Sequence, residues 1–335
     1  MTYLVTGAGG FVGLNLVEHL LTEGAHVRAL NDRPLPQAAL ARFCALPGKV
    51  EVIHADVRDR AAMAKAVEGA AGVVHAAAIT LGPAAALTPA RTAVEVNTLS
   101  TAILLDEARR AGVARFVYPS SSAVYGLAPF AGVPVTEDRE PTPAGLYGFT
   151  KLASEALVAE AARDGLTTVR ARITALFGPW EHDTGVRETL SPPFQTARRI
   201  LAGLPVRMSP AGGRDWTSAR DVARALAILL RAEALPHDVY NLSASATWRP
   251  CLLAEALGRR MPAEWSMTDA PTDEGDLAYH DDLTRTRAPI SGARFAADFG
   301  FDFMSPEAAT EDYAEWLEAL GPAAFGALRG AQRAV

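Results

Sequence analysis

The stretch Thr6-Gly7-Ala8-Gly9-Gly10-Phe11-Val12-Gly13 decides the fold, because it joins a strand pattern at Tyr3–Thr6 to a helix pattern at Phe11–Glu23. Glycines spaced in this way allow a tight turn, close approach of the backbone to a pyrophosphate, and close packing of helix on strand. The N-terminus of the helix presents free N–H groups and a partial positive charge to phosphate. We therefore predict a dinucleotide-binding loop, with ordinary turn glycines as the alternative. The loop residues expected to bind are Gly7, Gly10, Phe11, Val12 and Gly13.

Beyond this loop, short apolar runs alternate with helical patterns, which predicts an α/β fold with a doubly wound, Rossmann-type parallel sheet. After Arg172 the rhythm changes and Pro and Gly become frequent, so we expect a smaller C-terminal substrate-binding lobe. The expected division is 1–173 for the NAD(P)-binding domain and 174–325 for the lobe, with about 215–243 returning to the first domain. The expected strands are Tyr3–Thr6, Val27–Leu30, Val50–His54, Gly72–Ala77, Arg115–Pro119, Thr167–Arg172 and Val239–Leu242. The expected helices are Phe11–Glu23, Arg60–Val67, Val94–Ala111, Leu146–Arg163, Phe194–Leu201, Ala219–Ala232 and Cys251–Arg260.

The composition excludes several classes of protein. A net charge of −6 without clustered lysines or arginines makes nucleic acid an unlikely partner. The two cysteines, Cys44 and Cys251, lack the spacing of a metal site or a disulfide framework, which favours a cytoplasmic protein without a metal. The start of the chain resembles a strand rather than a secretion signal. The uncharged stretch Gly69–Ala90 is long enough to cross a bilayer, but its prolines and alanines favour a buried strand and a loop, so no membrane partner is expected.

Cofactor specificity is expected at the end of the second strand, in Leu30-Asn31-Asp32-Arg33. The Asp32 carboxylate can bond a ribose 2′-hydroxyl and would repel a 2′-phosphate, which favours NAD, whereas Arg33 leaves NADP open. Asp56-Val57 follows the third strand and could flank the adenine pocket, cap the helix near Arg60, or do both. The expected cofactor contacts here are Asn31, Asp32, Arg33, Asp56 and Val57, with Ala76, Ala77 and Ala78 at the end of the fourth strand as contacts or as core residues.

Tyr147 and Lys151, in Tyr147-Gly148-Phe149-Thr150-Lys151, predict a group that transfers protons. Side chains four residues apart share a helix face, so the Lys151 ammonium can lie near the Tyr147 phenol. A nearby positive charge favours phenolate and lowers the tyrosine pKa from about 10. An ordinary helical pair is the alternative.

The ordered motifs resemble the extended short-chain dehydrogenase/reductase superfamily, in particular its NAD-dependent epimerase/dehydratase family. The similarity covers almost the whole chain. It rests on the glycine loop, Asp56-Val57, Ala76–Ala78, Asn97, the serines before Ala123-Val124-Tyr125-Gly126, Tyr147 with Lys151, and Arg214-Asp215-Trp216-Thr217.

The resemblance implies a role for each catalytic residue. Tyr147 would take a hydroxyl proton while hydride passes to nicotinamide, Ser121 would bond the reacting oxygen, and Lys151 would lower the tyrosine pKa and hold the cofactor ribose. It also implies that Asn97 is a cofactor or water-relay position, with a plain helix residue as the alternative.

The substrate-binding residues expected are Ser122, Thr174, Ala175, Arg187 and Arg214. Arg214 matches a family arginine that often contacts a diphosphate, but Ala175 replaces an asparagine that commonly contacts the nucleotide sugar. Arg187 could bind a carboxylate, so a sugar acid or its lactone is also conceivable. The loop that contains His182 lacks firm metal-ligand geometry.

We therefore expect an NAD-dependent oxidoreductase or epimerase that acts on a secondary alcohol of a sugar or sugar-acid substrate. A nucleotide-sugar 4-epimerase or dehydratase is the first alternative, and a non-catalytic dinucleotide-sensing regulator is the second. The helices expected at Val94–Ala111 and Leu146–Arg163 are apolar on more than one side, which favours a homodimer over coverage of both by the small lobe.

Overall fold

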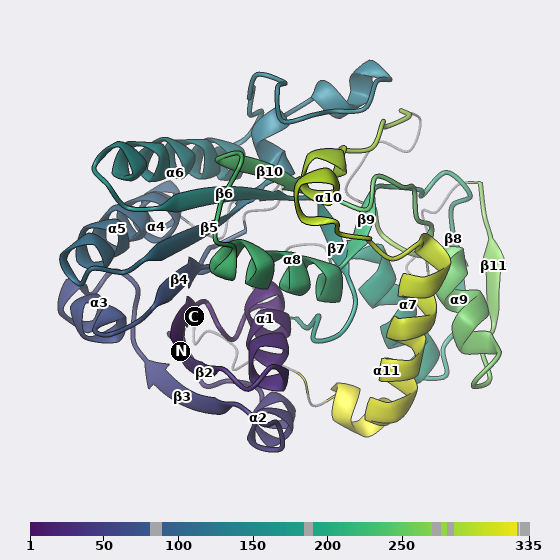
Figure 1. The fold of residues 1–335 in the computed structure, drawn as a ribbon. Helices are drawn as coiled ribbons and strands as arrows, with labels where there is room; N and C mark the ends of the chain where they lie inside the picture. Colours follow the sequence, from purple (N-terminus) through teal and green to yellow (C-terminus); the bar gives the residue numbers. More distant parts are fainter. Residues whose placement is uncertain (81–88, 184–189, 270–275, 280–284, 327, 329–335) are drawn as a thin grey trace.

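The computed structural model describes residues 1–80, 89–183, 190–269, 276–279, 285–326 and 328. At its centre lies a seven-stranded sheet in which every pairing is parallel (Figure 1). This confirms the predicted Rossmann-type α/β class. In their order across the sheet the strands are β10 (Val239–Leu242), β6 (Thr168–Ile173), β5 (Arg115–Ser121), β4 (Gly72–His75), β1 (Thr2–Thr6), β2 (His26–Asn31) and β3 (Lys49–His54).

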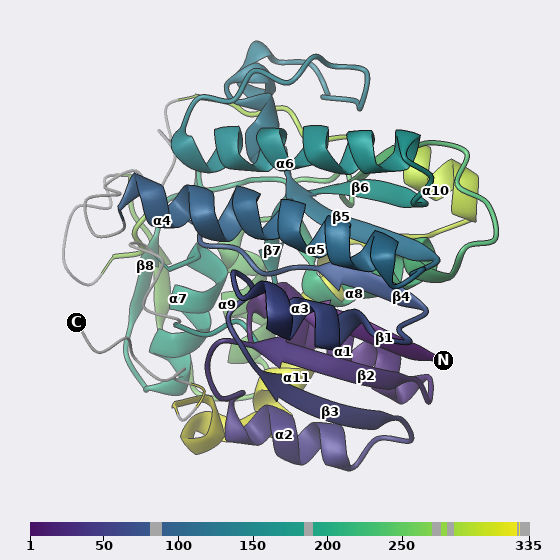
Figure 2. The same ribbon diagram turned by 90° about the vertical axis from the view of Figure 1, so that its left-hand side faces the viewer.

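Helices cover both faces of this sheet, as its buried apolar strands require. Two core clusters separate accordingly, one around α1 and α8 and one around α3, α5 and α6 (Figures 1 and 2). The helices of these layers are α1 (Phe11–Thr22), α2 (Gln37–Cys44), α3 (Arg60–Val67), α4 (Ala90–Val94), α5 (Ser100–Arg110), α6 (Leu146–Arg163) and α8 (Ala219–Arg231).

Some expected boundaries were wrong. Strand β4 ends at His75, so Ala76–Ala78 lie in the loop after it. The helix expected at Val94–Ala111 begins earlier, with α4, and passes through a π-helical turn at Glu95–Leu99 before α5. Helix α2 was not expected, because a short apolar pattern between prolines is a weak signal.

The C-terminal part adds a smaller helical lobe beside the carboxyl ends of the strands (Figure 1). Trp248 is fully buried at its centre and stacks on Phe177 with ring centroids 4.6 Å apart. Strand β10 and helix α8 belong to the layers of the main sheet, and the domain boundary at residue 173 stays a prediction. The remaining elements are β7 (Ala175–Phe177), α7 (Pro192–Leu201), β8 (Val206–Met208), β9 (Trp216–Ser218), α9 (Pro250–Gly258), β11 (Trp265–Met267), α10 (Ala293–Phe299) and α11 (Pro306–Gly326), with 3-10 turns at Ser122–Tyr125 and Ala128–Ala131.

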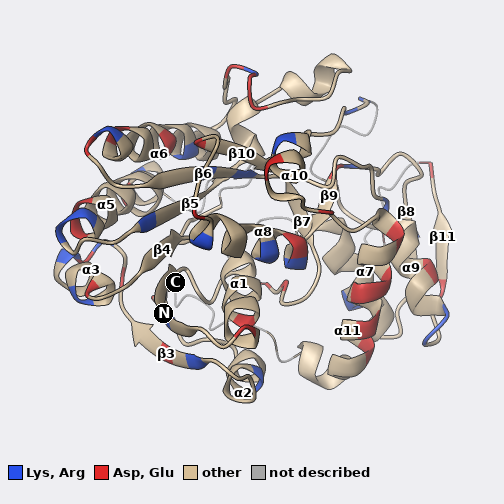
Figure 3. Ribbon diagram, viewed as in Figure 1, with Lys and Arg blue, Asp and Glu red and all other residues tan. Residues whose placement is uncertain are grey.

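Acidic and basic residues are interspersed along the outer elements of the chain (Figure 3). An example joins the turn after α9 to α11, where Arg260 lies 2.8 Å from Glu311 and 3.5 Å from Glu315. Among the described residues, no helix combines the length and apolar character that a bilayer crossing demands.

Candidate active site

A cavity of about 660 Å³ opens where the strands end, beside the point at which strand order reverses around β1. Ligands of open α/β sheets bind at such a point. Nearly all the site residues expected from the sequence line this cavity. They are Gly7, Gly10, Phe11, Val12, Gly13, Asn31, Asp32, Arg33, Asp56, Val57, Ala76, Ala77, Ala78, Ser121, Ser122, Tyr147, Lys151, Thr174, Ala175 and Arg214.

The glycine loop is shaped by close backbone packing. Gly7 has a φ of +65°, and a Cβ there would lie 2.6 Å from backbone atoms of Ala77. At Gly13 a Cβ would lie 2.2 Å from the Gly7 carbonyl oxygen. Helix α1 starts directly after Gly10 without a side-chain cap, so its first N–H groups remain available to a phosphate.

Asn31 organises the wall next to this loop. Its side-chain oxygen accepts from the Gly9 N–H at 3.2 Å, and its amide donates to the Arg33 carbonyl at 2.9 Å. Asp32 remains largely exposed at the cavity wall, 3.9 Å from the Arg33 guanidinium. A carboxylate is thus available where a ribose hydroxyl is expected.

Asp56 does not cap α3, which corrects one of its two expected roles. The cap is Asp59, which accepts from the N–H groups of Ala61 and Ala62. The Asp56 carboxylate instead binds the side chain and backbone N–H of Arg58, and the Arg58 hydrogen bonds hold its pKa below the usual value. Asp56 therefore orders the loop at the rim of the cavity.

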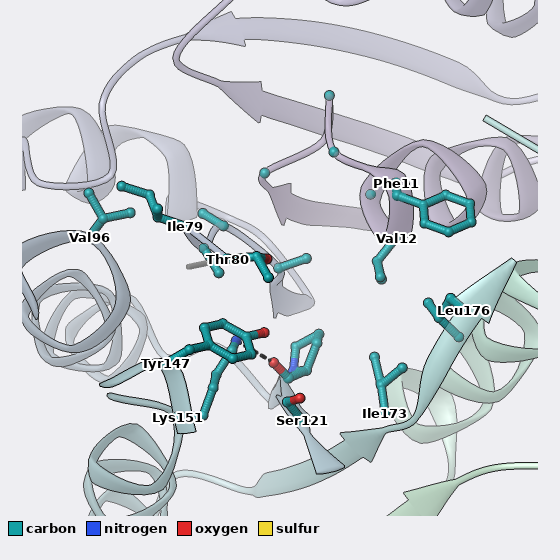
Figure 4. Close-up of a pocket in the computed structure, with 18 of the residues that line it drawn as sticks. Phe11, Val12, Ile79, Thr80, Val96, Ser121, Tyr147, Lys151, Ile173 and Leu176 are labelled. Carbon is teal, nitrogen blue, oxygen red and sulfur yellow. Dashed lines mark hydrogen bonds between the residues drawn. The ribbon is translucent and has the colours of Figure 1, made fainter. Parts of the chain in front are cut away.

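Tyr147, Lys151 and Ser121 meet at the opposite end of the cavity. Figure 4 shows the Tyr147 phenol and the Ser121 hydroxyl directed toward one space, with Val12, Ile173 and Leu176 across it. Ser121 is the last residue of β5, and Tyr147 and Lys151 lie on successive turns of α6. These side chains can act on the same substrate atom.

Lys151 is only 3% exposed. Its ammonium donates to the Pro119 carbonyl at 2.8 Å and lies 5.9 Å from the centre of the Tyr147 ring (Figure 4). Burial lowers its pKa to about 8, and the negative charge of Glu155 opposes that shift. The side chain is therefore mostly protonated at neutral pH and can stabilise a phenolate.

Asn97 is not part of the cavity wall. It is 1% exposed and lies in the π-helical turn. Its amide pairs with the backbone N–H and carbonyl of Ile79 and also donates to the Thr150 hydroxyl. In the structure it joins the loop after β4 to α6, so its expected role at the cofactor stays a prediction.

The part of the cavity wall that comes from the C-terminal half of the chain combines apolar and cationic groups. Thr174 directs its hydroxyl to Thr217 at 3.0 Å, so it is engaged within the protein. The Arg214 guanidinium lies 5.8 Å from the centre of the Trp216 ring, and Trp216 is the strand partner of Ala175. Arg187 lies outside the described residues.

The structure also places residues in the wall that sequence reasoning did not select. Arg287 comes from a segment without helical or strand periodicity, so no local signal pointed to it. Glu181 and His182 were seen only as part of a loop rich in ionisable groups, although both are buried in the wall. Trp180, which precedes them, has a φ of +67°, and this conformation turns the loop at that point. Within the described ranges, no three His, Cys, Asp or Glu side chains are grouped to hold a metal ion.

Comparison with known proteins identifies the family to which the chain belongs. The chain is 36% identical over 228 residues to sterol demethylase protein B of Methylococcus capsulatus, an alignment that covers 66% of this chain and 63% of that protein. The chain thus spans less than two thirds of this relative. It is 29% identical to a dTDP-glucose 4,6-dehydratase of Streptomyces antibioticus, over 97% of this chain and 98% of that one.

A solved structure, MoeE5 in complex with UDP-glucuronic acid and NAD, superposes with a TM-score of 0.74 at 26% identity. The superposition covers 95% of this chain and 99% of MoeE5. Residues 3–243 match the family described as the NAD dependent epimerase/dehydratase family. The resemblance inferred from the motifs is therefore confirmed, and the chain belongs to the NAD dependent epimerase/dehydratase family.

Proposed function

We propose that this protein is an NAD-dependent enzyme that oxidises or epimerises a secondary alcohol on a nucleotide-linked sugar or sugar acid. The observation that carries the proposal is the convergence of Tyr147, Lys151 and Ser121 at one end of a cavity whose other end is the glycine loop. A non-catalytic dinucleotide sensor would not need this complete proton-transfer group.

Bound NAD would supply a hydride acceptor, and residues of the chain would transfer the proton and orient the substrate. Tyr147 takes the proton of the substrate hydroxyl, Ser121 donates to the reacting oxygen, and the Lys151 ammonium stabilises the phenolate. The apolar side chains of Val12, Ile173 and Leu176 exclude water from this space.

The nucleotide-linked substrate is favoured by paired positive charge. Arg214 and Arg287 both line the cavity. Two guanidinium groups match the charge and the donor geometry of a diphosphate. MoeE5, with its UDP-glucuronic acid, supports a sugar carrying both a diphosphate and a carboxylate.

A second candidate substrate is a sterol alcohol. Ala175, Leu176 and Trp216 present apolar surface, and Ala175 stands where the family commonly has an amide. The sterol demethylase protein B relative is in keeping with this candidate. The paired arginines favour the sugar nucleotide over the sterol.

The test is a panel assay with purified protein and separate NAD and NADP. The panel holds UDP-glucuronic acid, UDP-glucose, dTDP-glucose, free sugars, sugar acids, lactones and a 3β-hydroxysterol. NADH formation indicates a dehydrogenase, whereas an isomerised or dehydrated product without net NADH indicates an epimerase or a dehydratase. Turnover of the sterol alone would overturn the sugar assignment, and no turnover with any member would overturn the enzymatic proposal.

We also propose a homodimer. Val94, Leu99 and Phe149 are 45%, 51% and 55% exposed along α4, the π-helical turn and α6. Helices α4, α5 and α6 face the viewer in Figure 2, and in Figure 1 they lie on the left of the molecule while α7, α9 and α11 lie on the right. A second copy would bury this apolar surface. Light scattering should give twice the chain mass, and Leu99→Glu should shift it to one chain.

A further inference from the structure

A buried row of polar side chains crosses three neighbouring strands next to the catalytic serine. Ser120 of β5 is the register partner of Arg172 in β6, and Arg172 is the partner of Asn241 in β10. All three side chains are buried. The row is therefore one residue from Ser121, at the end of the central strands.

Glu155 of α6 contacts this row. It is 2% exposed and accepts from the Ser120 hydroxyl at 2.5 Å. Arg172 donates to both of its oxygens, with Nη2 to Oε2 at 2.7 Å and Nε to Oε1 at 3.0 Å. The remaining arm of Arg172 donates to the Tyr125 hydroxyl at 2.9 Å, which donates in turn to Asn241 at 2.8 Å. Each side-chain nitrogen of Arg172 and each carboxylate oxygen of Glu155 thus has a hydrogen-bond partner, which offsets the cost of burying the ion pair.

The same helix carries the catalytic pair. Tyr147, Lys151 and Glu155 are spaced by four residues along α6 and share one face. Lys151 binds the carbonyl of Pro119, and Glu155 binds the side chain of Ser120. Two consecutive residues of β5 are therefore held by two successive turns of α6, directly before Ser121.

We propose that Glu155, balanced by Arg172, is a positioning residue that fixes the end of β5 against α6 and places a negative charge one helical turn from Lys151. The proposal rests on the function proposed above, in which Lys151 must be cationic beside Tyr147. Neither residue touches the reacting atoms, so both act through Ser121 and Lys151.

The charges that surround Lys151 support this role. Its pKa is lowered by burial and raised by Glu155. His75 of β4 carries no charge near neutral pH, because burial lowers its pKa to about 3. The ring centre of Tyr118 of β5 lies 4.7 Å from the Lys151 ammonium nitrogen. This side chain stays a neutral phenol because burial raises its pKa. Tyr147 of α6 also faces the ammonium, with its ring centre 5.9 Å away, and Arg172 of β6 forms an ion pair with Glu155.

The chain offers a direct measurement, because it contains only three lysines, at positions 49, 65 and 151. Protein labelled with ¹³C at the lysine ε-carbon should give three NMR signals to follow as pH changes. Lys49 and Lys65 are exposed and serve as internal references. This titration requires neither substrate nor turnover.

Two substitutions should move the Lys151 midpoint in opposite directions. Glu155→Gln removes the anion, so the midpoint should fall by about one pH unit. Arg172→Gln frees the Glu155 charge from its competing partner, so the midpoint should rise by a similar amount. Near pH 7.5, Glu155→Gln should lower kcat about threefold with a smaller change in KM, because the protonated fraction of Lys151 falls by that factor when its midpoint drops from about 8 to about 7. The control Glu160→Gln, at an exposed position on the same helix, should change neither the Lys151 midpoint nor kcat.

A purely structural role would weaken folding without shifting the midpoint in opposite directions. Unchanged Lys151 midpoints in both folded variants would overturn the proposal, even if the panel assay shows turnover. Opposite shifts in a protein that turns over no panel member would uphold it and overturn the proposed reaction instead. If Glu155→Gln does not fold, Glu155→Asp retains the charge and should keep the wild-type midpoint while lowering kcat. A midpoint shifted downward in Glu155→Asp would overturn the role of the charge.

Discussion

The indole N–H of Trp180 donates to the carboxylate of Glu18 at 2.6 Å, which joins the loop after β7 to the helix that follows the glycine loop. Asn15, one turn earlier on that helix, donates to the Pro179 carbonyl at 2.7 Å. The Trp180 ring also meets Trp316 of α11 edge to face, with centroids 5.2 Å apart. Helix α1 and helix α11 of the C-terminal lobe are therefore both in contact with the Trp180 side chain.

Replacing Trp180 by Phe should weaken the contact between α1 and the loop after β7. The variant loses a hydrogen bond to a charged acceptor, at a cost of roughly 1.5–3 kcal/mol in the free energy of unfolding. The substrate KM should rise more than kcat falls, because Glu181 and His182 follow Trp180 into the cavity wall. Urea unfolding and steady-state kinetics measure both. The control Arg42→Gln removes the exposed partner of Glu18 and should lower the free energy of unfolding by at most about 1 kcal/mol. An equal loss in both variants would show that the Trp180–Glu18 hydrogen bond has no special importance.

Tyr147→Phe should lower kcat by about 10²–10⁴-fold, the usual contribution of a positioned acid–base group. NAD affinity should remain similar, because the phenyl ring keeps its place on α6. Tyr3→Phe removes a different hydroxyl, which contacts Met1, and should leave kcat unchanged. Retained activity in Tyr147→Phe would mean that another residue transfers the proton.

Gly7→Ala should abolish NAD binding, because the new Cβ would lie 2.6 Å from the Ala77 backbone and the residue has a positive φ. Gly24→Ala is the matched control, since Gly24 has a φ of +77° but open space around it. That control should lose only roughly 1 kcal/mol of stability and keep its affinity. Calorimetric titration with NAD distinguishes the two, and equal affinities would show that the close approach is unimportant.

Asp32→Asn should weaken discrimination against NADP. Loss of the carboxylate removes its repulsion of a 2′-phosphate, so the ratio of NAD to NADP affinity should fall about tenfold. Adding Arg33→Gln should reverse part of that change by removing the nearby positive charge. An unchanged ratio in Asp32→Asn would place specificity elsewhere.

Lys151→Met should make the protein more stable at pH 7 but inactive. The folded-state pKa of Lys151 is about 8, below its ordinary 10.5, so the folded state binds this proton more weakly than the unfolded state. The weaker proton binding lowers the free energy of unfolding of the wild type by its full amount below pH 8, and this loss disappears as the pH rises to 10.5. The greater stability of Lys151→Met should therefore vanish over that range. After allowing for the lost bond to Pro119, the gain at pH 7 is on the order of 2 kcal/mol. Urea unfolding at pH 7 and 10.5 measures it; a gain that grows with pH would contradict the assignment.

Much of the main sheet was predictable, because local patterns carry it. The expected helices Arg60–Val67 and Leu146–Arg163 have the bounds found in the structure. Short strands such as β7 and β9 were missed, since three residues carry no periodicity and pairing between distant segments decides them.

The site divides in the same way. Local spacing pointed to the glycine loop, Tyr147 and Lys151, because each depends on one turn or one helix face. The choice between Asp56 and Asp59 as the helix cap depended on backbone geometry that two nearby aspartates do not reveal. Arg287 could not be found, since it reaches the cavity through the pairing of Val135 with Ile290.

The sequence alone determined the class of fold, and it located the glycine loop and the Tyr147–Lys151 pair on which the proposed function rests, because these depend on residues close together in the chain. Only the tertiary structure decided that Glu155 and Arg172 share a buried pair beside Ser121, and that Arg214 and Arg287 line one cavity. The burial of Lys151 and the charges near it depend on segments that are distant from it in the sequence. The proposed chemistry therefore rests on residues that are close in sequence, whereas the charges around them and the shape of the cavity depend on how the strands and the lobe come together.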